Sequence, residues 1–450
     1  MASPSLSQQI ALTRRRLLGL SGGMLGALWA NWARALAAPL GGGKAKSVIL
    51  IFNCGGPSHI DLWDPKPDAG ENVRGPFSTI STKVPGVFVS ELLPNLAARA
   101  DKLAIVRTMH HTQGNHNSAM YYAITGYPYR IDSTLINPSA ADMPSFGTLV
   151  GWLAQRDGYS GAVPPYVITP YPHCDSDVYI TPGQYGSCLG VRFDPLVVNA
   201  DPARPDFRVR NLTAPKELTP ERVNDRIGLL SQLGAVSRVD PSAAAPLEEH
   251  RKKAVQMTLS GDASRAFDLS LEKPETRERY GRHSWGQSHL LARRLIEAGS
   301  KFVTTVNGRS IIWDTHLDNF NRLKKQLVPP METAYVALLD DLEERGLLDE
   351  TLVVWMGDFG RTPTINKDAG RDHWPQCGSM VFAGGGVRGG QVIGKSDKSG
   401  AYPVERPIAP ADIHASVFSA LGYDPQGITY YDLDGRPIPL SHGKAIAELF

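Results

Sequence analysis

Histidine, aspartate and asparagine gather in four short segments of the sequence. These are residues 53–61 (NCGGPSHID), 110–118 (HHTQGNHNS), 313–319 (WDTHLDN) and 358–374, which begins DFGRT and ends DHW. Carboxylates and imidazoles suit zinc, manganese or another hard to borderline divalent ion. Such an ion polarises an ester oxygen and lowers the pKa of bound water. Arg361 adds a planar fork of donors that suits two oxygens of a phosphate or sulfate.

Each of these segments follows a run of residues typical of a buried strand. Residues 46–53 (KSVILIFN), 103–109 (LAIVRTM) and 351–356 (TLVVWM) are short, apolar and rich in β-branched side chains. The remaining elements that we predict are strands at 164–170, 301–306 and 380–383, and helices at 92–100, 118–125, 287–297, 332–344 and 413–421, within a helical pattern from 219 to 298. Strands that alternate with helices predict an α/β fold, a three-layer α/β/α sandwich around a largely parallel sheet. Ligands bind beyond the carboxyl ends of such strands, so we expect the polar segments to meet there.

The composition is that of a globular protein with a small net charge. Hydrophobic residues make up 42% of the 450 residues, and 47 basic residues nearly balance 45 acidic ones. We therefore expect one large core and no nucleic-acid partner. Cys174 and Cys188 are close enough in sequence for a disulfide, which the sequence neither requires nor excludes, whereas Cys54 is expected to be a buried thiol. His173 and His283 lie in polar segments and are expected at the surface.

The first residues have the pattern of an export signal. Residues 13–18 (TRRRLL) pair arginines with apolar residues, residues 17–30 form a short apolar stretch, and 35–37 (ALA) offer a small-x-small cleavage site. We predict a twin-arginine signal peptide at 1–38, the translocase as export partner, and a periplasmic or extracellular location. A basic amphipathic helix that stays attached is the alternative. The mature part is predicted as one domain, 39–450, with an insertion at about 127–215 and no stable membrane span after cleavage.

The order of several longer motifs resembles a known family. The motifs are the twin-arginine leader, GGPSHIDLWDPKP at 55–67, NHNSAMYYAITG at 115–126, SHLLARRLIEAGSKFV at 288–303, WDTHLDNF at 313–320, MGDFGRTP at 356–363 and GRDHW at 370–374. On these motifs the chain is identified as a member of the exported bacterial family called domain of unknown function 1501. That family is a sulfatase-like branch of the alkaline phosphatase superfamily.

The resemblance implies two divalent metals that flank a serine, threonine or formylglycine nucleophile. Asp314 and His316 resemble the pair that holds one metal. Asp358 resembles the acidic ligand at a strand end, and His373 resembles the later histidine ligand. Because the WDTH spacing is tighter than in the phosphatases, Asp318 is an alternative to His316.

Three positions depart from the pattern of the superfamily. Asn53 stands where an aspartate is usual, and Phe359 stands where a histidine is usual. Asn117 falls at the nucleophile position and cannot attack, so Ser118 is the nearest hydroxyl and His116 the nearest base or ligand. These departures argue against a mechanism that requires two metals.

Three functional interpretations follow. In the first, one metal held by Asp314, His316, Asp358 and His373 serves to hydrolyse a sulfate or phosphate ester of a small molecule or glycan. His116 and Asp61 add ligation or acid-base function, Asn53 is a further candidate ligand, and metal-bound water or Ser118 attacks. In the second, the fold has lost hydrolysis and binds an anion or carbohydrate. In the third, the protein is an envelope or secretion partner with a structural metal.

Overall fold

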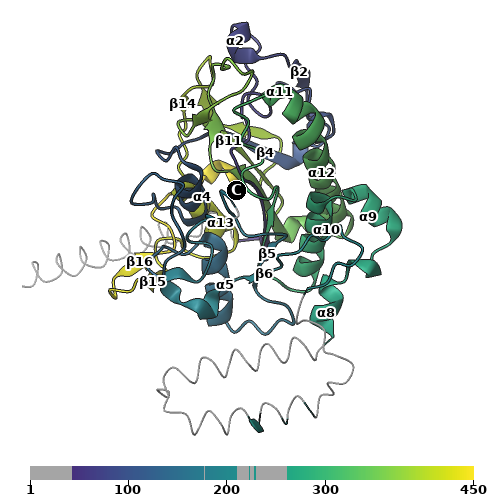
Figure 1. Ribbon diagram of the computed structural model, residues 1–450, viewed down its shortest axis with the longest axis vertical. Coiled ribbons are helices and arrows are strands. Elements are labelled where there is room, and N and C mark those ends of the chain that lie inside the picture. Colours follow the sequence, from purple (N-terminus) through teal and green to yellow (C-terminus); the bar gives the residue numbers. More distant parts are fainter. Residues whose placement is uncertain (1–42, 177, 210–221, 223–224, 226–227, 230–260) are drawn as a thin grey trace, which may run out of the picture.

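The computed structural model describes residues 43–176, 178–209, 222, 225, 228–229 and 261–450, and an eight-stranded sheet lies at its centre (Figure 1). The strands follow one another across the sheet in the order β12 (Gln391–Ile393), β4 (Leu103–Met109), β11 (Gly378–Ala383), β8 (Thr351–Gly357), β1 (Ser47–Asn53), β7 (Phe302–Val306), β5 (Tyr166–Thr169) and β6 (Leu196–Val197). β11 runs antiparallel to its neighbours β4 and β8, whereas the other strand pairs are parallel. The prediction of a largely parallel sheet is confirmed.

Every residue of the central strand β1 is buried, which shows that both faces of the sheet are covered. Ile49 and Ile51 belong to one hydrophobic cluster, and Val48, Leu50 and Phe52 belong to the other, as the two-residue period of a strand requires. The first cluster is formed with α3 (Pro94–Ala97), α8 (Asp262–Phe267), α9 (Pro274–Tyr280), α10 (Ser284–Glu297) and α12 (Val328–Glu344), and the second with α4 (His116–Thr125), α5 (Phe146–Arg156) and α13 (Pro410–Ala420). This arrangement is the predicted α/β/α sandwich.

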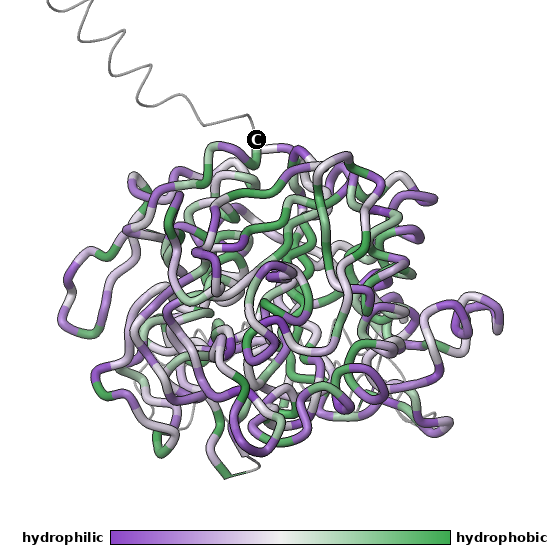
Figure 2. Tube along the Cα trace, turned by 90° about the horizontal axis from the view of Figure 1, so that it is seen from above, coloured by the Kyte–Doolittle hydropathy of each residue, from purple (hydrophilic) through white to green (hydrophobic). Residues whose placement is uncertain are grey.

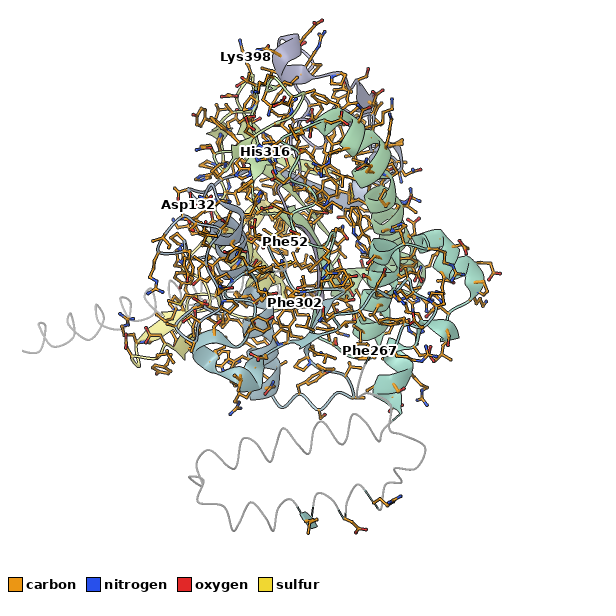
Figure 3. The ribbon with its side chains drawn as sticks, viewed as in Figure 1. Phe52, Asp132, Phe267, Phe302, His316 and Lys398 are labelled. Carbon is orange, nitrogen blue, oxygen red and sulfur yellow. The ribbon has the colours of Figure 1, made fainter. Side chains whose placement is uncertain are left out.

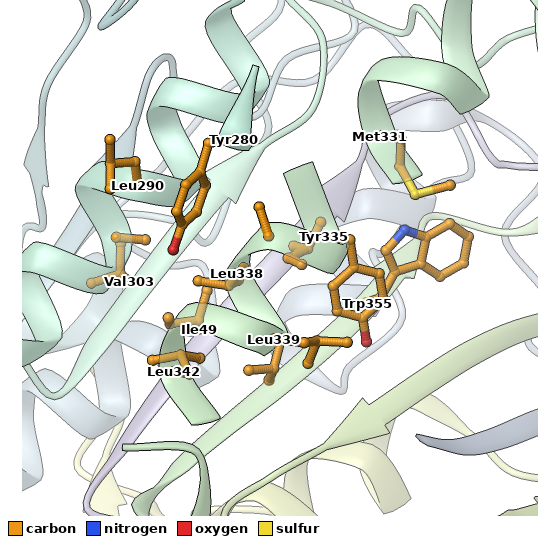
Figure 4. Close-up of a cluster of buried hydrophobic side chains, with 14 of the residues drawn as sticks. Ile49, Tyr280, Leu290, Val303, Met331, Tyr335, Leu338, Leu339, Leu342 and Trp355 are labelled. Atoms are coloured by element: carbon orange, nitrogen blue, oxygen red, sulfur yellow. The ribbon is translucent and has the colours of Figure 1, made fainter. Parts of the chain in front are cut away.

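The two clusters form the core of the molecule. Figure 4 shows part of the first cluster, where Ile49 of β1 and Val303 of β7 lie near Leu338 and Leu342 of α12. In Figure 2 the central strands are largely hydrophobic and many peripheral loops are hydrophilic. Burial of this apolar surface is the main stabilising contribution to the sheet, at about 25 cal/mol per Å².

Shorter elements surround the sheet. They are α2 (Glu71–Arg74), α11 (Asn319–Arg322) and four two-stranded pairs: β2 (Thr79–Ser81) with β3 (Phe88–Ser90), β9 (Gly360–Arg361) with β10 (His373–Trp374), β13 (Lys395–Ser396) with β14 (Pro403–Glu405), and β15 (Thr429–Tyr431) with β16 (Pro437–Pro439). The pair of β9 and β10 matters most for function, because it places Arg361 directly opposite His373.

The range 127–215 contributes more than an insertion. It supplies α5 to one face and β5 and β6 to the sheet. α5 begins after Ser145, whose Oγ accepts a hydrogen bond of 3.1 Å from the backbone N–H of Thr148. That serine before an apolar run is an N-cap signal, and it could have identified the helix. The helical pattern expected between 219 and 257 lies almost entirely outside the described residues, as does the predicted signal peptide.

Several local expectations differ from the structure. His173 is 1% exposed and packs edge-on against Phe52, with ring centroids 4.5 Å apart, so the prediction of a surface position was wrong. Its polar sequence neighbours fold back over the core. No disulfide joins the four cysteines, all of which lie among the described residues, and Cys54 is buried as expected. Among the described residues no helix is both long and apolar enough to cross a membrane.

The buried His289 on α10 should make stability depend on pH. Its Nδ1 lies 2.8 Å from the Trp285 carbonyl, its Nε2 has no hydrogen-bond partner within the described part of the chain, and burial lowers its pKa to about 3. In the unfolded chain this imidazole binds a proton near pH 6.5, whereas in the folded core it stays neutral until the pH approaches 3. The contribution of this group is therefore complete above about pH 6.5 and is lost as the pH falls toward 3. In urea unfolding series, His289→Phe should flatten this dependence; an unchanged slope would contradict the assignment.

Candidate metal centre

The four polar segments converge beyond the carboxyl ends of the strands. β1 ends at Asn53, β8 ends just before Asp358, and the chain after β4 leads into α4, which begins at His116. In Figure 3 the strands rise from Phe302, at the beginning of β7, past Phe52 near the end of β1, and His316 lies above both. The centre is therefore where an open parallel sheet binds its ligands.

Asp358 is the buried carboxylate on which the centre is built. It is 0% exposed. Its Oδ1 accepts a hydrogen bond of 3.0 Å from the backbone N–H of Gly55, and its Oδ2 lies 2.5 Å from Nδ1 of His116. Gly55 has φ +106°, and a Cβ there would lie 2.5 Å from the backbone nitrogen of Asp314. Only glycine allows the turn after β1 to approach both acidic residues so closely.

Three imidazoles are oriented in the same manner. In each, Nδ1 lies at hydrogen-bond distance from an oxygen, which is Asp358 Oδ2 for His116 (2.5 Å), Asp372 Oδ1 for His316 (2.5 Å) and the Gly114 carbonyl for His373 (2.7 Å). These contacts assign an N–H to Nδ1, so that Nε2 carries the lone pair in the neutral form of each ring. Histidines that bind metals are usually held this way.

The three Nε2 atoms surround the carboxylate of Asp314. They lie 3.5 Å (His116), 3.1 Å (His316) and 3.4 Å (His373) from its oxygens, and Nε2 of His316 is 3.0 Å from Nε2 of His373. In a tetrahedral zinc site with bonds of about 2.0 to 2.1 Å, neighbouring donors lie about 3.3 to 3.4 Å apart. Ligand atoms of His116, Asp314 and His373 all lie within 4.8 Å of one another. These three residues therefore fit one divalent ion, and His316 lies outside this group but contacts Asp314 and His373.

The charges at the centre also favour the binding of a cation. Burial raises the pKa of Asp314, but hydrogen bonds with His116 and His373 and the charge of Arg361 lower it far below its usual range. Burial lowers the pKa of His116, whereas the charge of Asp358 and contacts with Asp314 raise it, and the result is about 9. Asp314 is thus a carboxylate that requires positive charge close by, which protons or a metal ion can provide.

Arg361 binds protein groups instead of an external anion. Its Nη1 lies 2.7 Å from Asp314 Oδ1, and its Nε donates to the Gly56 carbonyl at 2.8 Å. Its remaining hydrogen bonds go to the carbonyls of Gly55, Trp313 and Arg371. Because the side chain is fully buried and its donors are engaged, Arg361 fixes the turn after β1 and the position of Asp314.

Asn53 and Asp61 lie in hydrogen-bond networks beside the centre. The amide of Asn53 donates to the Met356 carbonyl and accepts from Asn307, each at 3.0 Å. Asp61 forms a buried bidentate pair with Arg371, with distances of 2.8 and 2.9 Å. Its carboxylate also accepts hydrogen bonds from Ser58 and Asn319. In this arrangement both side chains are engaged with protein groups outside the set of imidazoles.

Ser118 and Asp318 point to other partners. The Oγ of Ser118 donates to Asp132 Oδ1 at 2.6 Å, because residues two apart on a helix face different directions. Asp318 is exposed and accepts a hydrogen bond from Asn321 at 2.7 Å. The structure therefore brings together His116, Asp314 and His373 as possible ligands, with His316 beside them and Asp358 holding His116. Sequence reasoning missed Asp372, although it directly precedes His373.

Cys54 does not compete as a metal ligand. Burial and the nearby charge of Asp358 raise the pKa of its thiol well above the ordinary value. The thiolate that binds metals is therefore disfavoured.

The roles of Asp61 as ligand or as structural partner can be separated by mutation. Asp61→Ala leaves the buried Arg371 without its counter-charge, so we expect it to lose about 3 to 5 kcal/mol of stability while the zinc affinity of the folded fraction stays unchanged. Urea unfolding and zinc titration measure the two quantities. A variant with wild-type stability and weakened zinc binding would instead place Asp61 among the ligands.

Comparisons with other proteins place the chain in a family. Structural neighbours include Ps i-CgsB in complex with k-i-k-neocarrahexaose (TM-score 0.40, 11% identity, 84% of this chain and 72% of that chain covered). They also include an alkaline phosphatase superfamily protein from Vibrio parahaemolyticus (0.38, 11%, 86% and 68%) and the phosphonate monoester hydrolase SpPMH from Silicibacter pomeroyi (0.38, 13%, 89% and 76%). No curated protein sequence matches the chain. The model of the family described as Protein of unknown function (DUF1501) matches residues 45–450, and the chain belongs to that family.

Proposed function

We propose that this protein is an exported, metal-dependent hydrolase of sulfate or phosphate esters, with a sulfated or phosphorylated small molecule or glycan as its substrate. The observation that carries the proposal is the convergence of three imidazole Nε2 atoms on the carboxylate of Asp314. A divalent ion bound there supplies Lewis acidity toward an ester oxygen and lowers the pKa of water. Zinc suits this donor set best among the common ions.

The chain's own residues orient the donors and leave one side open. Asp358 and Asp372 each hold one imidazole, and Arg361 holds Asp314. The side chains of His316 and Asp372 are 40% and 51% exposed, whereas that of His116 is 2% exposed. An ester would therefore approach from the side of His316, with the His116 side closed to water. Ser118 faces Asp132, which favours water over a serine as the attacking group.

A non-catalytic binding protein is the second candidate. It is favoured by the engagement of Arg361 with the protein, which leaves no free guanidinium for a transferred oxyanion at this position. In this case the same ion would hold an anion or carbohydrate without turnover.

Zinc binding is the first test of the proposal. Purified mature protein should bind one zinc ion per chain, and His373→Ala should abolish tight binding because it removes a ligand. Asp372→Asn should weaken the affinity about 10- to 100-fold, since it loosens only the orientation of His316. The exposed His442→Ala is the matched control. Mass spectrometry of metals after dialysis and a competition titration give stoichiometry and affinity; equal binding by His373→Ala and wild type would refute the site.

Turnover separates the two candidates. The zinc-loaded protein should hydrolyse an aryl sulfate or an aryl phosphate ester, and His373→Ala should reduce the rate to background while His442→Ala retains it. One equivalent of zinc with no release of the aryl alcohol would favour the binding protein.

Export is tested in whole cells. Arg14→Lys with Arg15→Lys should retain the protein in the cytoplasm, because the translocase recognises the paired arginines. Fractionation and blotting measure its location. Normal export of the double variant would contradict the twin-arginine route.

A further inference from the structure

A segment far from the metal ligands in sequence lies between the first turn of α4 and the loop that leads to Asp314. It comprises residues 171–176 and 178–181 and is called here the roof segment. The backbone N–H of Asp175 donates to the Tyr179 carbonyl, and that of Thr181 donates to the His173 carbonyl, each at 3.1 Å. These bonds fold the segment back on itself, so its two arms lie side by side.

One side chain, Asn117, fastens the roof segment to α4. Its amide nitrogen lies 3.3 Å from the Tyr179 carbonyl, and its amide oxygen accepts a hydrogen bond of 3.0 Å from the hydroxyl of Thr181. The same nitrogen donates to the carbonyls of Thr134 and Ile136, at 2.9 and 3.2 Å. Asn117 is 0% exposed. A single buried amide thus joins the first turn of α4 to two separate loops.

The roof segment is also held from the opposite side. The hydroxyl of Ser310, in the loop that leads to Asp314, donates to the Asp175 carbonyl. The guanidinium of Arg309 lies over the ring of Tyr171, 5.6 Å from its centroid. The buried ring of His173 packs on Phe52 of β1. The segment is therefore attached both to α4, which carries His116, and to the loop that leads to Asp314.

These attachments bring the half-buried Asp175 into the electrostatic field of the centre. Burial raises its pKa, and its carboxylate interacts with the charges of Asp314 and Asp358, which raise the pKa further, and with His116 and His373, which lower it. The charges of the centre therefore reach the carboxylate of Asp175, while Ser310 and Tyr179 hold its backbone.

We propose that Asn117 is a positioning residue that holds the roof segment over the centre and thereby presents Asp175 to the bound ester. His116 and Asn117 are adjacent in the first turn of α4, so one helix turn aligns a metal ligand and the roof. The presentation of Asp175 to an ester rests on the proposed function, whereas the fastening of the roof by Asn117 does not.

The test uses zinc-loaded full-length mature protein and a chelator in excess. Asn117→Asp keeps the size and the acceptor of the side chain but removes its amide donors. It should accelerate zinc release at least about tenfold, as the loss of several buried hydrogen bonds implies, with the stoichiometry unchanged. Hydrogen exchange of the peptide over 171–181 should rise in parallel. Asn72→Asp, the same change at an exposed site on α2, should do neither.

Thr181→Val removes the hydroxyl that donates a hydrogen bond to Asn117. If Asn117→Asp does not fold, this variant tests whether Asn117 holds the roof segment. Unchanged release and exchange in the folded variants would overturn the proposal. If the protein binds no zinc, hydrogen exchange over 171–181 alone tests the role of Asn117.

Where turnover is measurable, Asp175→Asn should lower kcat/KM without accelerating zinc release. Combining it with Asn117→Asp should then add little to the loss; additive losses would overturn the link between the two residues.

Discussion

Two carboxylates beyond the carboxyl ends of the sheet, the buried Asp358 and the partly buried Asp314, impose the constraint on which the site depends. A buried negative charge costs several kcal/mol unless hydrogen bonds and positive charge compensate it. Asp358 obtains this compensation from the backbone of Gly55 and from His116. Asp314 obtains it from Arg361 and from imidazoles that can share a proton or a metal ion. Neutralising these charges organises the turn after β1, the first turn of α4 and the pair of β9 and β10.

The surrounding residues divide into those that face the centre and those that hold its frame. Arg361 and the pair of Asp61 with Arg371 belong to the frame, because their donors and acceptors are engaged with the protein. The three oriented imidazoles face the centre. Asn117 stands at the position where the family resemblance places a nucleophile. Its amide holds a loop by hydrogen bonds and provides no catalytic hydroxyl. Asn117 therefore supplies no hydroxyl for a covalent attack, while the imidazole Nε2 atoms still converge on Asp314.

Much of the fold could be predicted from the sequence, because buried parallel strands have continuous apolar runs. The strand predicted at 103–109 has the bounds of β4, and the alternation of strands and helices predicted the sandwich. The same pattern predicted that the polar segments would meet, since strand ends lie at one edge. It could not predict which way each side chain points. Whether Asp358 is a ligand or holds His116 depends on a turn made possible by Gly55. The contact of His316 with Asp372, 56 residues apart, depends on the register of β9 and β10, and nothing in the sequence indicated that Asp175 approaches the centre.

X-ray absorption at the zinc edge of the zinc-loaded protein tests the central claim most directly, because it reports the atoms bonded to the ion. The account predicts nitrogen and oxygen donors alone, at about 2.0 to 2.1 Å, with the outer-shell scattering of several imidazole rings. Sulfur at about 2.3 Å, or a first shell without imidazole, would contradict a centre made of His116, Asp314 and His373 with His316 beside them.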